Sequence, residues 1–298
     1  MSATRDFLGY GGTPPDPQWP HGARVAVSFV INVEEGAERS IADGDERNEG
    51  TYESLEELHG IPDPCQDSHY EYGTRVGYWR VMEEFTKHKA VGTMNICGRA
   101  IERSPWIAQD SLSRGHELAC HGWRWERHAG MSEAQERAAI ARAVLAIKSA
   151  SGGVAPAGWH TRSAASVNTR RLLLEHGGFL YDSDAYCDDL PFFVTVGDRR
   201  HLVLPYSFDT NDMHFNQGSQ RFVEGRDFAA YVIDAYDRLW EEGAHAPRMM
   251  SIGLHLRMIG RPARIGALDM IFRHLAQKGG AWIARRDSIA RHWLDRFG

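Results

Sequence analysis

Apolar residues along the chain fall into strand-like and helix-like patterns that alternate. Residues 25–33 form a near-continuous apolar run, which is typical of a strand buried on both faces. Residues 76, 79, 82 and 85 are apolar at helical spacing and predict a helix with one apolar face. The same patterns predict further strands at residues 91–96, 117–120, 155–159, 201–206, 249–255 and 281–284, and helices at 132–147, 168–176, 227–240, 265–275 and 287–297.

This succession amounts to roughly seven strand–helix alternations, which implies an α/β fold with a largely parallel sheet. The periodicity does not decide between an open sheet and a closed barrel. In either architecture, functional side chains are expected at the carboxyl ends of the strands.

Two stretches lie outside the alternation. Residues 9–23 are rich in Gly and Pro and predict an extended arm, and residues 34–74 are polar with little periodicity. A loop of that length is usually functional or disordered. Because no repeat or linker is visible, we expect a single domain over residues 1–298, with an N-terminal arm at 1–23.

Composition and charge narrow the partners. The chain is 42% hydrophobic and 25% charged, with a formal net charge of −6 and no long basic run. This argues against nucleic acid or an anionic membrane as the main partner. Four scattered cysteines without C-x-x-C spacing favour a reducing compartment. The first residues lack an apolar signal core and no apolar run has membrane-spanning length, so we expect a cytoplasmic protein.

Polar clusters follow several of the predicted strands. Glu34 and Glu35 come directly after the first strand. Adjacent residues at a strand end point to different sides. If both glutamates face a pocket, mutual repulsion and burial raise the pKa of at least one of them, and a carboxylate so tuned can act as a general base. The alternative is a solvated loop start, which is the commoner fate of such a pair. The buried strand before it favours function.

Three more clusters recur at strand ends and carry His121, Arg162 and His255. A histidine there can act as an acid, a base or an oxyanion partner, and an arginine can anchor a carboxylate, ureide or imide oxygen. A lone histidine is more often structural, and an arginine often forms only a surface salt bridge. Their regular recurrence at strand ends is stronger evidence than any single cluster.

The order and spacing of these clusters resemble the polysaccharide deacetylase family. The resemblance implies a distorted (β/α)7 barrel, with Glu34 as the catalytic base and Glu35 as a metal-binding acid. His121 would match the first metal histidine and His255 the late general acid, and Arg162 lies in the arginine motif. Trp125 stands where the family has its second metal histidine, and both family aspartates are glutamates here.

Tryptophan cannot bind zinc, and His128, on a helix, would lie two turns beyond His121. We therefore expect no metal and no cofactor. A subgroup of the family, the cofactor-independent allantoinases, shows the same loss. It is similar to this chain at residues 7–11, 32–36, 71–73, 121–125, 168–171, 178–184, 188–191, 204–206, 209–213, 251–255 with Arg257, and 259–264.

This resemblance implies hydrolysis of allantoin to allantoate in a homotetramer. Either Glu34 or Glu35 would deprotonate water, while His121 and His255 would bind the oxyanion and protonate the leaving nitrogen. Trp125 would either stack on the substrate ring or plug the vacated ligand position. The residues expected to hold the polar arms of the substrate, or to line its pocket, are Arg162, Tyr206, Asn211 and Arg257.

Three alternatives remain open from the sequence. The first is an imidase or a hydantoin-opening cyclic amidohydrolase, which shares the chemistry. The second is a metal-dependent deacetylase of N-acetylated sugars, which needs the missing zinc ligands. The third is a catalytically inactive binding protein that kept the fold, although Glu34, Glu35, His121 and His255 all persist.

Overall fold

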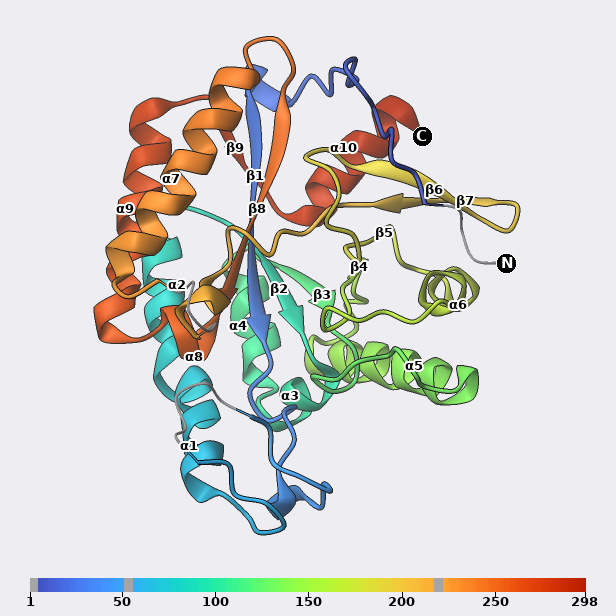
Figure 1. Cartoon of the computed structure of the whole chain (residues 1–298), viewed down its shortest axis with the longest axis vertical. Helices are drawn as coiled ribbons and strands as arrows, with labels where there is room; N and C mark the ends of the chain where they lie inside the picture. Colours follow the sequence, from blue (N-terminus) through green and yellow to red (C-terminus); the bar gives the residue numbers. More distant parts are fainter. Residues whose placement is uncertain (1–4, 51–55, 217–221) are drawn as a thin grey trace.

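A curled, mostly parallel sheet organises the molecule (Figure 1), which we describe from a computed structural model at residues 5–50, 56–216 and 222–298. The strands follow the order β6-β7-β5-β4-β3-β2-β1-β8, and β9 pairs with β1. Their bounds are β1 Val25–Val33, β2 Thr93–Ile96, β3 Glu117–Cys120, β4 Gly158–Trp159, β5 Tyr181–Asp182, β6 Phe192–Val196, β7 Arg199–Val203, β8 Arg248–His255 and β9 Ala281–Ile283.

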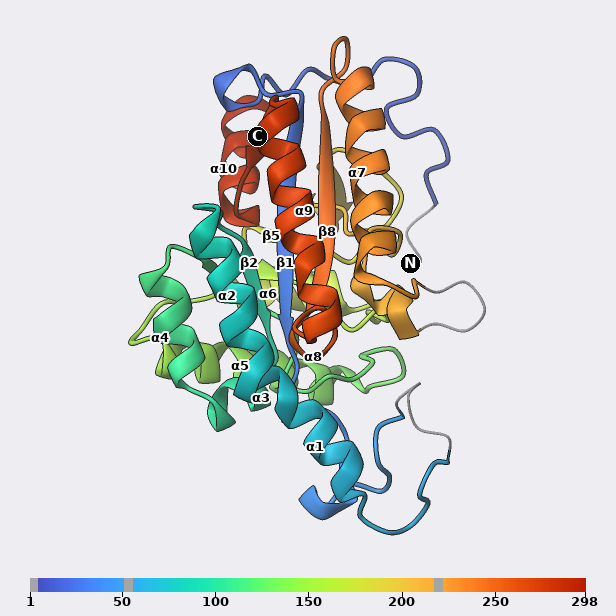
Figure 2. The same ribbon diagram turned by 90° about the vertical axis from the view of Figure 1, so that its left-hand side faces the viewer.

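Helices connect the strands and cover the outside of the sheet (Figure 2). Short 3-10 turns occupy Pro20–Gly22, Ile41–Asp43 and Asp212–Asn216, and a π-helical turn, η3, spans Gly73–Gly77. The α-helices are α1 Pro64–Tyr72, α2 Tyr78–Lys87, α3 Gly98–Arg103, α4 Trp106–Ser113, α5 Glu133–Ala150, α6 Thr169–His176, α7 Gly225–Glu242, α8 Leu256–Ile259, α9 Pro262–Lys278 and α10 Arg286–Phe297.

Strand β1 is the centre of the fold. All nine of its residues are buried, as the continuous apolar run predicts for a parallel strand covered on both faces. It pairs in parallel with β2 and β8, so that Asn32 lies opposite both Asn95 and His255. The Phe29 ring packs against Phe85 of α2 and Phe272 of α9, at centroid distances of 5.6 and 4.7 Å.

The predicted distorted α/β barrel is confirmed as a half-barrel. Among the described residues, no ladder joins the end strands β6 and β8, and only an isolated bridge between Asn211 and Gly253 continues the sheet beyond β8. The antiparallel hairpin β6–β7 was missed in part, because the sequence patterns predict only its second strand. Helices α3 and α4 were also not predicted.

The polar stretch 34–74 is more ordered than its composition suggests. It contains α1, whose N-cap Asp63 accepts hydrogen bonds from the backbone N–H groups of Cys65 and Gln66. The signal was an Asp-Pro step, because aspartate favours the N-cap and proline the first helical position. Residues 51–55 of this stretch, and residues 1–4 of the N-terminal arm, lie outside the described residues.

The arm itself is held against the C-terminal helix. Trp19 is buried and packs near Trp282 and Trp293, with ring centroids 5.8 and 6.1 Å away. Its indole Nε1 donates to the carbonyl of Arg248 at the start of β8. Across the described residues, no helix has both the length and the apolar character needed to span a membrane.

Candidate active site

A pocket of about 570 Å³ opens at the carboxyl ends of the parallel strands. It is the place where such sheets put their functional groups, because the loops after the strands meet there. Residues from the ends of β1, β3, β4 and β8 line it together. The lining residues include Asn32, Glu34, Arg39, Glu49, His121, Trp125, His160, Arg162, Tyr206, Asn211 and His255.

Glu34 lies at the centre of the charged groups of this pocket. Its Oε1 is 3.4 Å from His121 Nε2 and 3.3 Å from His255 Nε2, and its Oε2 accepts a 2.7 Å hydrogen bond from Arg257. Burial alone would raise the pKa of Glu34, but His255 and Arg257 outweigh burial and hold that pKa well below its ordinary value. Glu34 is therefore ionised, and the raised pKa that the sequence predicts for a buried catalytic carboxylate falls on Glu35 instead.

The Oε1 atom of Glu34 is buried, and the Nε2 atoms of His121 and His255 lie 3.4 and 3.3 Å away without hydrogen-bond geometry. A donor from a bound molecule would complete the hydrogen bonding of this oxygen. A water molecule at this oxygen would satisfy it and would be placed for deprotonation.

Glu35 points to the other side of the strand end, as expected for adjacent residues. Its Oε2 accepts from the backbone N–H of Glu34 and its Oε1 from the backbone N–H of Arg257. Burial raises the pKa of Glu35, with the neighbouring Glu34 charge adding to the rise and Arg257 opposing it. Glu35 does not line the pocket, so its contacts are those of a residue that fixes the backbone.

His255 is held as an imidazolium. Its Nδ1 lies 2.6 Å from Asp212 Oδ1, and the other oxygen of Asp212 accepts from the backbone N–H groups of His255 and Ile259. Burial alone would lower the pKa of His255, but the carboxylates of Glu34 and Asp212 raise it to about 9. An imidazolium beside an ionised carboxylate is the arrangement that a general acid and a general base require.

His121 has a fixed ring orientation. Its Nδ1 lies 2.6 Å from the carbonyl oxygen of His160, and because a carbonyl can only accept, this nitrogen carries the proton. Nε2 therefore faces Glu34. The His160 ring is 5.2 Å from that of His121 and 4.4 Å from that of Tyr206. Burial, with the neighbouring His121, keeps the pKa of His160 well below its ordinary value, so its ring is neutral.

Arg257 joins the two glutamates instead of projecting into the pocket. Its guanidinium is buried, lies 3.6 Å from Glu35 Oε1, and stacks over the rings of Tyr70 and Trp125 at 4.5 and 4.9 Å. It is absent from the pocket lining. The expectation that Arg257 holds a substrate arm therefore stays a prediction without direct support from this geometry.

Arg162 lines the pocket but is already paired. Its two Nη atoms bind both carboxylate oxygens of Glu49, at 3.1 and 2.9 Å, and one of them also donates to the carbonyl of Trp125. Its guanidinium lies 3.4 Å over the Trp125 ring. Arg162 thus covers one face of that ring, which favours the plugging role over stacking on a substrate.

Four residues of the site were not singled out from the sequence: Asn32, Glu49, His160 and Asp212. Asn32 and His160 stand in the same strand-end clusters as Glu34 and Arg162, so their position was a usable signal. Asp212 stands in the similar stretch at residues 209–213 but was given no role. Glu49 lies in the polar stretch after β1, where nothing in the pattern marks it.

The family resemblance implies a divalent metal, which the residues here do not fit. Trp125 offers no ligand atom, and both oxygens of Glu35 are occupied by backbone donors. The guanidinium of Arg257 already neutralises Glu34, and a fixed cation beside a metal position repels the metal. The residues present therefore do not fit a divalent metal.

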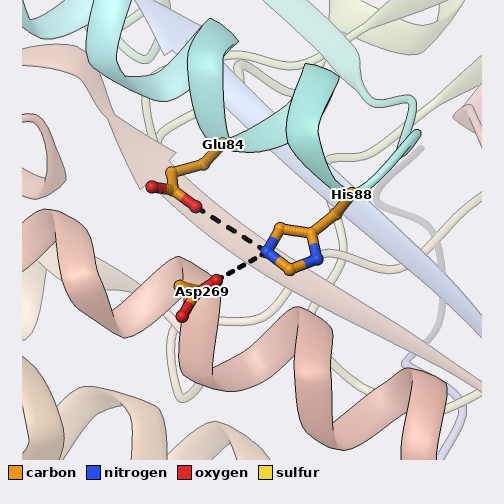
Figure 3. Close-up of side chains that lie close together, drawn as sticks. All are labelled: Glu84, His88 and Asp269. Atoms are coloured by element: carbon orange, nitrogen blue, oxygen red, sulfur yellow. Dashed lines mark hydrogen bonds and ion pairs between the residues drawn. The ribbon is translucent and has the colours of Figure 1, made fainter.

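Another histidine–carboxylate cluster lies away from the pocket. Within the described ranges, the one group with the ligand spacing of a metal site is Glu84, His88 and Asp269, between α2 and α9 (Figure 3). Its Asp269 carboxylate also contacts Lys87 and Arg273, both at 2.7 Å. These cations already balance the acidic charge, so the cluster is an ion-pair network that joins the two helices.

Comparisons with known proteins agree with this fold. The family described as "Polysaccharide deacetylase" matches residues 67–178. A putative polysaccharide deacetylase of Schizosaccharomyces pombe is 38% identical over 98% of each chain. A probable polysaccharide deacetylase of Pseudomonas aeruginosa is 43% identical, with a TM-score of 0.93 over 98% of each chain.

A second solved structure, described as Puue allantoinase, is also 43% identical to the chain. Its TM-score is 0.94, over 100% of this chain and 99% of the other. Identity of this size over whole chains leaves no large unmatched segment on either side. The chain therefore belongs to the polysaccharide deacetylase family and is a hydrolase that acts on C–N bonds.

Proposed function

We propose that this protein opens the ring of a cyclic ureide by hydrolysing a C–N bond, with allantoin as the substrate and allantoate as the product, and that it does so without a metal. The observation that carries the proposal is Glu34, an ionised buried carboxylate between His121 and His255. The 43% identity to an allantoinase over the whole chain supports the choice of substrate.

In the proposed mechanism, a water molecule binds at Glu34 Oε1. Glu34 takes one proton from it, and the resulting hydroxide attacks the ring carbonyl carbon. The C–N bond then breaks as the His255 imidazolium gives its proton to the leaving nitrogen. Glu34 returns its proton to His255, so that one water is added in each turnover. A cyclic ureide nitrogen leaves more readily than a simple amide nitrogen, which makes this acid–base pair sufficient.

The geometry supports Glu34 over Glu35 as the proposed base. Glu34 faces the pocket, whereas Glu35 is turned toward backbone N–H groups. His121, whose Nδ1 carries the ring proton, would accept a hydrogen bond from the attacking water at Nε2. Trp125, which lies under the Arg162 guanidinium, would fill the vacated metal-ligand position and narrow the pocket for a small substrate ring.

A substrate panel tests the proposal. The purified protein is incubated with allantoin, hydantoin, succinimide, glutarimide and an N-acetylated sugar oligomer, and product formation is followed for each. We expect allantoin to give the highest kcat/KM. Turnover of an imide alone would replace the substrate but keep the reaction. Release of acetate alone would overturn the proposal, and tight binding without any turnover would indicate a binding protein.

We further propose that the enzyme works in the cytoplasm, in purine degradation, as a homotetramer. The exposed apolar residues Phe7 and Leu8 of the N-terminal arm, with 82% and 78% of their surface accessible, support a subunit contact. Sedimentation of the full chain checks the assembly. A tetramer mass is expected, and a monomer at micromolar concentration would contradict it.

A further inference from the structure

The hydroxyl of Tyr206 is a hydrogen-bond donor with no acceptor in the described part of the protein. Its oxygen lies 3.2 Å from Asn32 Nδ2 and 3.2 Å from Asn211 Nδ2, and the residue lines the same pocket as Glu34 and His255. The chemistry of these three side chains decides which atom gives a proton and which receives one.

The backbone fixes the orientation of both amides. Asn211 Oδ1 accepts from the backbone N–H of Met213 at 2.9 Å, and a backbone N–H can only donate. Asn32 Nδ2 donates to the backbone carbonyl of Leu254 at 3.1 Å, and a carbonyl can only accept. Neither amide can be flipped without losing its backbone bond. Both therefore present an N–H group to Tyr206.

The tyrosine oxygen thus accepts two hydrogen bonds, which use its acceptor capacity. Its own O–H proton must go to a third partner, and none is found among the described residues. Burial raises the pKa of Tyr206 above its ordinary value, so the hydroxyl keeps its proton across the physiological range. The proton is left for a molecule that enters the pocket.

We propose that Tyr206 is a catalytic residue whose O–H donates to the carbonyl oxygen of the substrate and stabilises the oxyanion, with Asn32 and Asn211 as the positioning residues that aim it. The inference rests on the proposed function. The proton stays on Tyr206 throughout, so the proton transfers of the proposed mechanism are unchanged. A donor that is oriented before the substrate binds needs no reorganisation as charge develops on the oxygen.

The elements of the fold hold this donor in register with the base. Asn32 and Glu34 are two residues apart at the end of β1, so their side chains share one side of the strand. On β8, Gly253 leaves the space that the cluster occupies. A Cβ atom there would lie 2.3 Å from the Tyr206 oxygen and 2.4 Å from Asn211 Nδ2.

The first test is Tyr206→Phe, which removes the hydroxyl and keeps the ring. We expect kcat on the substrate that the wild type prefers to fall about 10²–10³-fold, as for other oxyanion donors, while KM changes little. The matched control is Tyr236→Phe on α7, a buried tyrosine whose hydroxyl donates to the carbonyl of Gly279. It should keep wild-type kcat. Wild-type kcat in Tyr206→Phe would overturn the inference.

The second test is Asn211→Asp, which replaces an N–H donor by a carboxylate acceptor. The Tyr206 proton would then bind the new carboxylate and be withdrawn from the substrate. We expect kcat to fall as far as in Tyr206→Phe, and the double variant to fall no further, because both changes remove one interaction. Independent, multiplicative losses in the double variant would contradict the positioning role. Far-ultraviolet circular dichroism confirms that each variant is folded.

These results separate the two proposals. If the wild-type enzyme turns over none of the cyclic substrates, the proposed function fails and the role of Tyr206 falls with it. If the wild type is active and Tyr206→Phe is equally active, only the role of Tyr206 fails. A selective loss of kcat in Tyr206→Phe supports both.

Discussion

At the scale of single residues, the pocket depends on two neighbouring glutamates in opposite environments. Glu34 is surrounded by cationic partners and ionised, whereas Glu35 accepts backbone hydrogen bonds and has a raised pKa. Two like residues held in different electrostatic surroundings often take different roles in an enzyme. Their roles should therefore separate on substitution with the uncharged, nearly isosteric glutamine.

Glu34→Gln should lower kcat about 10²–10⁴-fold, the contribution typical of a general base, with the fold intact. Glu35→Gln should instead reduce the free energy of unfolding by about 1–3 kcal/mol, because an amide cannot accept at both buried positions. Steady-state kinetics and urea unfolding of both variants measure the two effects. The reverse result, with Glu35→Gln inactive and Glu34→Gln active, would move the base to Glu35.

The pH dependence of kcat/KM should follow His255 and Glu34. His255 must be protonated to act as the acid, so activity should fall as pH rises through about 9. Because the pKa of Glu34 is lowered, this residue should not limit activity until pH falls below the ordinary glutamate range. A decline centred near pH 6 to 7, the ordinary histidine range, would contradict the raised pKa of His255.

The raised pKa of His255 also makes the stability of the folded protein depend on pH. The pKa of His255 is higher in the folded protein than its ordinary value of 6.5. The stabilisation by His255 is therefore complete below pH 6.5 and is lost as pH rises through about 9.

Replacing Asp212 by asparagine should move the alkaline limb of activity to lower pH, by about one unit or more. An unmoved limb would show that Asp212 does not set this pKa.

At the scale of elements, close backbone contacts hold the site's supporting turns. A Cβ atom on Gly77, in the π-helical turn, would lie 2.2 Å from the carbonyl oxygen of Leu256, the residue after His255. Gly73 in the same turn packs directly on the side chain of Glu35. The turn η3 and helix α8 therefore support the two ends of the site through contacts that tolerate no added atom.

Gly77→Ala should reduce the free energy of unfolding by about 1–3 kcal/mol, because its neighbour is backbone and cannot move aside cheaply. Gly266→Ala is the matched control. Gly266 lies inside α9 with open space around its would-be Cβ, so alanine there should stabilise by about 0.5–1 kcal/mol. Chemical unfolding of the two variants measures both. Equal effects would contradict the close packing of η3 on α8.

The helices and strands also show which parts of the fold the sequence pattern could predict. The apolar run of β1 and the capping box of α5 predicted their elements because the signal is local. Helix α1 was missed because it is short and polar and depends on its cap, Asp63. Strand β4 lies within the strand predicted at residues 155–159. Strand β5 was missed because it spans two residues, and so short a ladder is defined by its neighbours, not by periodicity.

For the candidate site, the sequence predicts which residues come together but not how their side chains pair. Glu34, His121 and His255 stand at strand ends, and the parallel sheet brings such ends together. Which glutamate faces the pocket depends on side-chain direction, and the pairing of Arg162 with Glu49 joins residues 113 positions apart. No sequence pattern encodes a contact of that separation. That the chain is one domain over its whole length remains a prediction.

At the scale of the whole molecule, the curled sheet determines which side chains surround Glu34. It places Arg257 and Trp125 beside this residue, and neither the guanidinium nor the indole offers a metal-ligand atom. The positive charge that balances Glu34 is therefore covalently part of the chain. The central claim of our account is that this built-in charge, with His255 as the acid, makes hydrolysis independent of metal.

The most direct test is the turnover of racemic allantoin by protein treated with EDTA and freed of the chelator. Our account predicts rapid formation of allantoate at the rate of untreated protein, with no increase when zinc is added. Activity that is lost with EDTA and returns only with zinc would contradict it, and would mean that other residues complete a metal site around Glu34.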